Sequence, residues 1–324
     1  MKREVLRGGW IKQGSVFAFP YEWQRPVKTE EWVFETLFNK NVNSIFVEFI
    51  SFPWATLIDL LSRGKMERAS QLVSVLNELP PKKTLVRATA CQHINPSIIE
   101  DLLVKINVTD LYWSHKTILS ERMGVIRLHP MAIYPVAYFE YKNNKFAPVI
   151  EKKYLYSFVG AYDPHCYISS IRQAIFDLPE NNRSFILKRN KWHFEDYVYK
   201  LQIEGTELDS FYIDNFRKTT INYINIMRNS VFSLCPSGSG PNSIRLWEAL
   251  AFKCQPLVLS DGLDLPKNFY DRGFSKVKEK DLSFIIQKIL DYDYEKNEQH
   301  FYDVDEFIEN ITSDLFDKEF LKCL

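Results

Sequence analysis

The sequence has no excess of charge of either sign and few cysteines. Forty-one Lys and Arg residues balance forty-one Asp and Glu residues among 324, so the chain as a whole presents no electrostatic footprint for nucleic acid or an anionic membrane. The five cysteines are scattered and form no CxxC pair, which indicates neither a disulfide framework nor a zinc site. A reducing compartment fits this cysteine usage best.

Long apolar runs are also missing. Nowhere does the chain hold about 18 uninterrupted apolar residues, and the charged start MKREVLRGGWIKQG has no apolar stretch of signal-peptide length behind it. We therefore expect a soluble, unsecreted, cytoplasmic protein without a transmembrane segment. Apolar residues still make up 46% of the chain, which is ample material for hydrophobic cores.

The first part of the chain alternates β-rich runs with helical patterns. Strands are predicted at SVFAFP, SIFVEF, KTLVRATAC and DLYWSH, and helical stretches such as TEEWVFETLF and PSIIEDLLVKI separate them. Strands spaced in this way indicate parallel βαβ units. Asn95 followed by Pro96 predicts a helix start, because Asn can cap free amides and Pro loses no hydrogen bond at the first helical position.

A second α/β series follows a polar, aperiodic stretch, YKNNKFAPVIEKK, at residues 141–153. This stretch predicts a boundary between domains at 1–145 and 146–324. The second series holds strand patterns at YLYSFVGA, RSFILK, SVFSLC and PLVLSD, with a long amphipathic helix at about 209–228. We expect an α/β protein with two Rossmann-like domains facing across a cleft, and ligands of such sheets bind at the carboxyl ends of the strands.

One strand of the second series runs into a glycine-rich loop and then a helix. The strand is predicted at 231–235, the loop at 236–242 and the helix at 243–252. Such a loop lets backbone amides approach a phosphate at a helix N-terminus. The pattern matches neither GxGxxG nor the Walker A sequence, and most loops of this kind are only turns. Spacing alone leaves an anion site and a simple turn both open.

The helix after this loop is apolar on almost every side, which predicts burial. Its charged residues Arg245 and Glu248 are three positions apart and share a face. One interpretation is an internal ion pair. The other places both side chains in the cleft, with Arg245 bidentate to a diphosphate and Glu248 accepting the two hydroxyls of a ribose.

A family resemblance favours the second interpretation. The run CPSGSGPNSIRLWEALAFKCQPLVLSDGLDLP, residues 235–266, resembles the signature of the exostosin-like glycosyltransferases, family 47, whose core is CPxGxGxxSxRLxEAL. The run YSFVGAYDPHCYISSIRQAIF is similar to the SFxG strand of that family, with an Arg about a dozen residues later. Lys253 stands where Gly is usual, and Gln255 replaces an apolar residue. The N-terminal part resembles bacterial and viral members only at TACQHI and LYWSHK.

The resemblance implies an inverting glycosyltransferase of the GT-B fold. Such an enzyme moves a sugar from a nucleotide sugar, usually a UDP-sugar, to a hydroxyl of a glycan acceptor without a required metal or other cofactor. Fixed donors and a helix dipole can stabilise the departing diphosphate in place of a metal ion. Family context suggests synthesis of a surface polysaccharide. Nucleic acid is not expected as a partner, because the charge of the chain is balanced. The last helix, at about 302–324, would pack back on the N-terminal domain.

By position, the resemblance also assigns the donor-binding residues. Ser243 and Arg245 would hold the diphosphate, and Glu248 the ribose. Arg172 would come from a facing helix near the Gly160 turn. Asp163 would touch the sugar or form a turn. The loop residues that surround the diphosphate would be Ser237, Gly238 and Gly240.

Inversion by direct displacement also needs a base to take the proton of the acceptor hydroxyl. His93 is the first candidate because it follows a predicted strand, strand ends face the cleft, and imidazole titrates near working pH. Glu48, at the end of SIFVEF, is the second. A lone His at a strand end is more often structural. His115 and His129 are assigned to the scaffold.

Two DxD patterns and one aromatic run each have a structural explanation beside a functional one. Asp291-Tyr292-Asp293 and Asp303-Val304-Asp305 spell DxD, but neither follows a hydrophobic strand, so both are assigned to the surface. WHFEDYVY, from residue 192, fits an aromatic platform for a sugar or simply hydrophobic core.

Two other functions compete with the glycosyltransferase. They are a nucleotide-sugar epimerase or hydrolase of the same fold and a catalytically silent glycan- or nucleotide-binding protein. A silent protein has no physical reason to keep a buried charge pair that costs desolvation.

Overall fold

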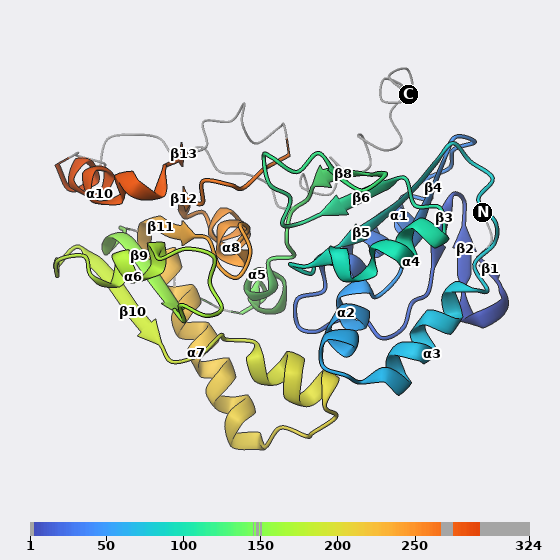
Figure 1. Cartoon of the computed structure of the whole chain (residues 1–324). Coiled ribbons are helices and arrows are strands. Elements are labelled where there is room, and N and C mark those ends of the chain that lie inside the picture. The colour runs from blue at the N-terminus through green and yellow to red at the C-terminus, as the bar shows by residue number, and fades with distance from the viewer. Residues whose placement is uncertain (1–2, 145, 147–148, 150, 267–274, 292–324) are drawn as a thin grey trace.

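Two β-sheets organise the protein, for which the computed structural model describes residues 3–144, 146, 149, 151–266 and 275–291. Figure 1 shows the N-terminal elements, in blue to green, around one sheet and the later elements, in yellow to red, around the other. The α/β class expected from the sequence is confirmed. The expected last helix at 302–324 and the DxD pattern at 303–305 lie outside the described residues, as do Tyr292 and Asp293.

The first sheet has a parallel centre, as the alternation of strands and helices predicts. Its strands are β1 (Glu4–Val5), β2 (Ile11–Gln13), β3 (Val16–Ala18), β4 (Val47–Ser51), β5 (Val86–Cys91), β6 (Asp110–Trp113), β7 (Arg122–Met123) and β8 (Ile126–Pro130). The order is β1-β2-β3-β4-β5-β6-β8-β7, with β3 to β6 and β8 parallel and the outer strands antiparallel. The carboxyl ends of β5 and β6 therefore lie at the same edge.

Short helices cover this first sheet. They are η1 (Arg7–Gly9), α1 (Thr29–Asn39), α2 (Trp54–Ser62), α3 (Met66–Leu76), η2 (Pro96–Ile99), α4 (Glu100–Lys105) and α5 (Val136–Tyr141). The helix start at Pro96 is confirmed, but the cap expected from Asn95 is not formed, because the Asn95 amide oxygen accepts a hydrogen bond from the Ser97 hydroxyl instead. We refer to β1 through α5 as the N-terminal half.

All strands of the second sheet are parallel. The order in which the chain adds them to the sheet reverses at the second strand of that order. Its strands are β9 (Tyr154–Ala161), β10 (Ser184–Arg189), β11 (Ser230–Pro236), β12 (Gln255–Leu259) and β13 (Ser275–Lys276), in the order β10-β9-β11-β12-β13. The chain leaves β9 toward β10 on one side and later returns to β11 on the other. In open parallel sheets, ligands bind beside the carboxyl ends of the strands at such a switch point.

The helices of this C-terminal half lie on both faces of its sheet. They are α6 (Ile171–Phe176), the π-helix η3 (Asp196–Ile203), α7 (Ser210–Arg228), α8 (Ile244–Ala251), η4 (Glu279–Asp281) and α10 (Leu282–Asp291). One core cluster joins α6 and α10 to the sheet, and another joins α7 and α8 to it. The run WHFEDYVY is expected to be either a sugar platform or core. Phe194 and Val198 lie in the core, whereas Trp192 is 39% exposed.

The two halves share part of their hydrophobic core. Trp32, Tyr134 and Val136 of the N-terminal half belong to the same buried cluster as Trp247 and Leu250 of α8. Figure 1 shows α5 beside α8 at this junction. Within the described residues, no helix combines the length and the apolar character needed to cross a membrane.

Candidate functional site

The glycine-rich loop leads from β11 into α8, as the sequence predicts. The chain leaves the sheet at Pro236 and enters the helix at Ile244, with Ser243 at the cap position. The Ser243 side chain makes no capping hydrogen bond. The loop is held tightly, because the Gly238 amide donates to the Gly240 carbonyl at 2.8 Å, and the Gly238 carbonyl accepts from the Ile168 amide at 3.0 Å.

Arg172 connects the carboxyl ends of the two strands at the switch point. It lies on α6, and its Nε donates to the Ser237 carbonyl just after β11 at 2.8 Å. Its Nη1 donates to the Ala161 carbonyl at the end of β9 at 3.1 Å. The side chain is buried, at 8% exposure. The structure therefore places this guanidinium where ligands of parallel sheets bind.

Arg245 points into the same region from the first turn of α8. Its Nη2 donates to the Val159 carbonyl of β9, while Nε and Nη1 are buried and have no hydrogen-bond partner in the part of the chain that the structure describes. Both Arg245 and Arg172 face the ring of Phe158, with guanidinium carbons 4.5 and 5.8 Å from its centre. Arg172 also lies 4.4 Å from the ring centre of Tyr167.

These two arginines form a buried pair of like charges. Burial, and next the positive charge of Arg245, lowers the pKa of Arg172 to about 10. Among the residues that the structure describes, neither guanidinium forms an ion pair with a carboxylate. Unpaired buried charge and unmade buried hydrogen bonds are both unfavourable. The site therefore fits an anion with several acceptor oxygens.

Glu248 does not pair with Arg245, so the interpretation as an internal ion pair is wrong. One carboxylate oxygen of Glu248 accepts from the Ala137 amide at 3.0 Å, and the other accepts from the Tyr223 hydroxyl at 2.8 Å. The residue is 2% exposed, and burial raises the pKa of its carboxyl group. Glu248 thus ties α8 to α5 and α7. Each oxygen keeps a lone pair, and the ribose role stays a prediction.

The three glycines assigned to the site provide space for charged and polar side chains. A Cβ at Gly160 would lie 3.1 Å from Arg245 Nη2, and one at Gly238 would lie 3.2 Å from Arg172 Nη2. A Cβ at Gly240 would lie only 2.4 Å from Nδ1 of His115. A larger residue at Gly240 would displace the imidazole of His115, one at Gly160 would displace the ring of Phe158, and one at Gly238 would press on the guanidinium of Arg172.

Ser237 and Asp163 make local hydrogen bonds. The buried Ser237 hydroxyl lies 3.0 Å from the Ser169 hydroxyl and donates to Glu279 at 3.0 Å. Asp163 is exposed, and its carboxylate accepts from the His165 amide at 2.9 Å, which closes a turn. A contact of Asp163 with the sugar stays a prediction.

Of the two candidate bases, the structure places only His93 at the carboxyl edge of the first sheet. His93 follows β5; its Nε2 lies 3.5 Å from Asp59 Oδ1, and its Nδ1 accepts from the Asn95 amide at 3.1 Å. Glu48 is the second residue of β4 rather than the last. It forms a buried ion pair with Arg87, its neighbour in the sheet, at 2.5 Å. The expectation that Glu48 lies at the end of its strand is wrong, because the strand continues beyond the predicted run to Ser51.

Sequence reasoning missed a group of residues between the halves. His115 and Lys116 follow β6 and meet the glycine-rich loop and the turn after β12. The Asn242 amide donates to the Ser114 carbonyl at 2.6 Å, and Lys116 pairs with Asp264 at 2.5 Å. A signal was present, because His115 follows β6 as His93 follows the neighbouring strand β5. The assignment of His129 to the scaffold agrees with its 2.8 Å contact to Asp110.

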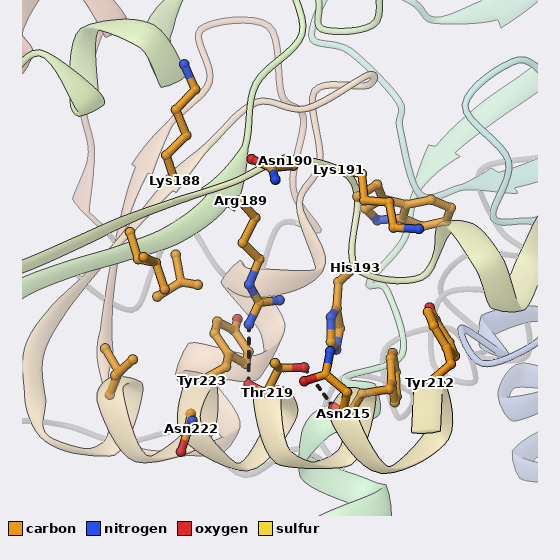
Figure 2. A pocket seen from close by; sticks show the side chains of 15 residues that line it. Lys188, Arg189, Asn190, Lys191, His193, Tyr212, Asn215, Thr219, Asn222 and Tyr223 are labelled. Atoms are coloured by element: carbon orange, nitrogen blue, oxygen red, sulfur yellow. Dashed lines mark hydrogen bonds between the residues drawn. The ribbon is translucent and has the colours of Figure 1, made fainter. Parts of the chain in front are cut away.

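A cavity of about 360 Å³ lies beside Val159, between the end of β10 and α7 (Figure 2). Arg189, the last residue of β10, points toward α7 and donates to the Thr219 carbonyl at 3.3 Å. Burial lowers the pKa of Arg189. Tyr223, whose hydroxyl donates to Glu248, forms part of the wall. The 15 lining residues include Arg and Lys but no Asp or Glu.

The described residues contain no group of three or more His, Cys, Asp or Glu side chains placed to hold a metal ion. The side-chain donors around the switch point are the guanidiniums of Arg172 and Arg245 and the hydroxyls of Ser169 and Ser237, the last of which donates to Glu279. Such donors suit an anionic ligand.

Comparison with known proteins matches the same region. The family model described as "Exostosin GT47 domain" matches residues 104–286. Over 125 residues, the chain is 31% identical to Exostosin-1 of Drosophila melanogaster, an alignment that covers 39% of this chain. The aligned part spans 15% of that relative.

Proposed function

The chain belongs to the Exostosin GT47 domain family, and from this premise we propose that it is an inverting glycosyltransferase. The donor would be a nucleotide sugar of the UDP type, and the acceptor a hydroxyl of a glycan in surface polysaccharide synthesis. The observation that carries the proposal is the buried pair Arg172 and Arg245, with unmade hydrogen bonds at the switch point of the second sheet.

A diphosphate would satisfy both arginines at once. Its oxygens can accept from Nε and Nη1 of Arg245, which have no hydrogen-bond partner among the described residues, and its negative charge offsets the repulsion between the two guanidiniums. Amides at the start of α8 would add to this, since a helix N-terminus favours anions. Ser243 and the loop at Gly238 and Gly240 would lie against the same phosphates.

In the proposed reaction, the acceptor oxygen forms a bond to the anomeric carbon of the sugar while the bond from that carbon to the phosphate oxygen breaks. The electron pair of the broken bond goes to the nucleoside diphosphate, and the proton of the acceptor hydroxyl goes to a base. Fixed positive groups aimed at the departing diphosphate lower the barrier. Arg172 and Arg245 would supply them without a required metal.

The nucleoside would extend from the diphosphate along α8 toward α7. Glu248 would accept from the ribose hydroxyls there. The cavity in Figure 2 provides room for the base beside Tyr223, at the low end of the size range of ligand pockets. Arg189 lines the same cavity, so its guanidinium would lie near the ligand.

The N-terminal half would hold the acceptor in a GT-B arrangement, with domains at 1–145 and 146–324 and the base at the edge of its sheet. His93 remains the proposed base, with Asp59 as the carboxylate that orients it. To accept a proton at Nδ1, His93 must release the Asn95 amide. We place the reaction in the cytoplasm, and the four described cysteines are free thiols, as a reducing compartment requires.

The test is a thermal unfolding series with UDP, GDP and UDP-sugars on the wild type, Arg245→Ala and the control Arg183→Ala. Arg183 is exposed on the same half. UDP at about 100 times its Kd should stabilise the wild type and the control by roughly 2.7 kcal/mol, a shift of a few degrees. Arg245→Ala should fold, because it removes an unpaired buried charge, but should lose the shift. Equal stabilisation of Arg245→Ala, or no nucleotide effect on the wild type, would contradict the proposal.

A further inference from the structure

His115 lies where the two halves meet. It follows β6 on a short segment that is fixed to the C-terminal half on both sides. Before it, the Ser114 carbonyl accepts from the Asn242 amide at 2.6 Å. After it, Lys116 pairs with Asp264 at 2.5 Å, and Thr117 forms a β-bridge with Leu263. The backbone at His115 is therefore held against the glycine-rich loop.

The imidazole of His115 is buried, at 7% exposure, and has unmade hydrogen bonds. Its Nδ1 is sealed from solvent and has no hydrogen-bond partner within the described ranges. Among the described residues, none hydrogen-bonds to Nε2, and this nitrogen is not among the sealed atoms. Burial, and next the charge of His93, lowers the pKa of His115 to about 3, so the ring is neutral at working pH. A buried polar group normally finds a partner.

Solvent access favours a proton on Nε2. Nδ1 is sealed beside Gly240, where a Cβ would lie 2.4 Å from Nδ1 and 3.0 Å from both Cγ and Cε1. A proton on Nδ1 would be a buried donor without an acceptor among the described residues, which is costly, whereas a proton on Nε2 can reach solvent or a ligand. In the neutral ring, we therefore expect the proton on Nε2.

The glycine-rich loop contacts both His115 and Arg172. Gly238 and Gly240 are joined by a hydrogen bond of 2.8 Å. Gly238 borders Arg172, whose Nη2 would lie 3.2 Å from a Cβ there. Gly240 borders His115 on the other part of the same loop. Arg172 and His115 thus approach the loop from different halves of the molecule.

We propose that His115 contacts the substrate and donates a hydrogen bond from Nε2 to a phosphate oxygen of the bound nucleotide. This inference rests on the proposed function and names a residue of the N-terminal half that the donor itself would engage. Binding of the nucleotide sugar would give the Nε2–H group of His115 a hydrogen-bond acceptor. It would also give the N-terminal half a direct contact with the departing group.

Three substitutions separate hydrogen bonding from packing. His115→Phe keeps a ring against Gly240 but removes the donor. His115→Gln carries an amide N–H near the position of Nε2, whereas His115→Asn carries its amide nearer to Nδ1. We expect the Kd for UDP, measured by calorimetry, to rise about tenfold for Phe and Asn, as for one hydrogen bond to a charged group. Gln should remain within about threefold of the wild type. The melting temperature of His115→Phe should equal or exceed that of the wild type, because the orphaned Nδ1 is removed.

The outcomes distinguish this inference from the proposed function. If UDP binds the wild type and Arg245→Ala abolishes binding while His115→Phe binds UDP as the wild type does, the inference about His115 fails alone. If Phe and Gln lose affinity equally and both unfold at lower temperature, His115 only packs against the loop, and the inference is again overturned. If no nucleotide binds the wild type, both proposals fall together.

Discussion

Three arginine side chains are buried among the described residues, and they differ in whether a carboxylate neutralises them. Arg87 has Glu48 at 2.5 Å, and its remaining donors bind the Ile106 and Pro80 carbonyls. Arg172 and Arg245 contact backbone carbonyls and aromatic faces, and no carboxylate of a described residue pairs with them. A satisfied buried pair serves the scaffold, whereas unsatisfied buried cations are costly unless a ligand completes them. This contrast favours the second sheet as the ligand site.

Glu30 is a buried carboxyl group, and its ionisation should make the free energy of unfolding depend on pH. It is 4% exposed and accepts from the Ala55 and Gln92 amides at 3.1 Å. Burial raises its pKa from 4.5 to about 8. Between these values the folded state keeps a proton that the unfolded state releases, so the free energy of unfolding falls as pH rises. One proton contributes up to about 1.4 kcal/mol per pH unit.

Glu30→Gln should remove this part of the pH dependence, so that the difference in melting temperature between wild type and variant changes steadily from pH 5 to pH 8. Glu35→Gln, an exposed change on the same helix, should follow the wild type at every pH. Identical pH slopes for wild type and Glu30→Gln would show that Glu30 is ionised in the folded state.

At the scale of elements, the π-helix η3 connects the two halves outside the proposed site. Its wide turn is closed by the Glu204 amide, which donates to the Tyr199 carbonyl at 2.9 Å. The Arg63 guanidinium lies 3.6 Å from the ring centre of Tyr199, and Arg68 donates to the Gln202 carbonyl at 2.9 Å. Both arginines come from the N-terminal half. Figure 1 shows η3 reaching toward α2 from below the second sheet.

Gln202 should contribute measurably to this connection. Its side chain donates to the Trp23 carbonyl at 2.6 Å and accepts from the Arg25 amide at 2.8 Å. Gln202→Ala leaves both backbone groups without these partners and should lower the free energy of unfolding by about 1–3 kcal/mol. Urea denaturation provides the measurement. Leu201→Ala, an exposed change on the same helix, should cost less, and equal losses for the two variants would mean that water replaces the bonds of Gln202.

At the scale of the whole molecule, the halves are held together by a shared core and by polar contacts near the proposed site. Lys116 is 5% exposed at its side chain, and its partner Asp264 is 21% exposed. Removing Asp264 therefore leaves a buried ammonium group without its carboxylate, whereas removing the ammonium leaves a carboxylate that water reaches. The two substitutions should differ in cost for this reason.

A double-mutant cycle with Lys116→Met and Asp264→Ala tests this asymmetry. Asp264→Ala should lower the free energy of unfolding more than Lys116→Met does, by as much as about 3–5 kcal/mol in total. The double variant should be close to Lys116→Met, so the coupling energy should be about as large as the loss from Asp264→Ala alone. Chemical denaturation measures all four proteins. Additive losses would show that Lys116 is not dependent on this carboxylate.

Local patterns in the sequence determined the elements. The α/β class, the strand at 230–236, the loop after it and the buried helix α8 all follow from the period of apolar residues and from turn residues within a few positions of each other. The same motif carried the family assignment, because its residues are contiguous in the chain. These features depend on near neighbours, so one sequence is enough to predict them.

Tertiary contacts decided how the side chains are paired. The apolar run around Glu48 does not show that Arg87 is its partner, and the spacing of Arg245 and Glu248 does not show that they turn to different partners. The position of His115 against Gly240 joins residues from opposite halves. Burial, charge pairing and an unmade hydrogen bond depend on what surrounds an atom in space, and segments far apart in the chain supply those surroundings.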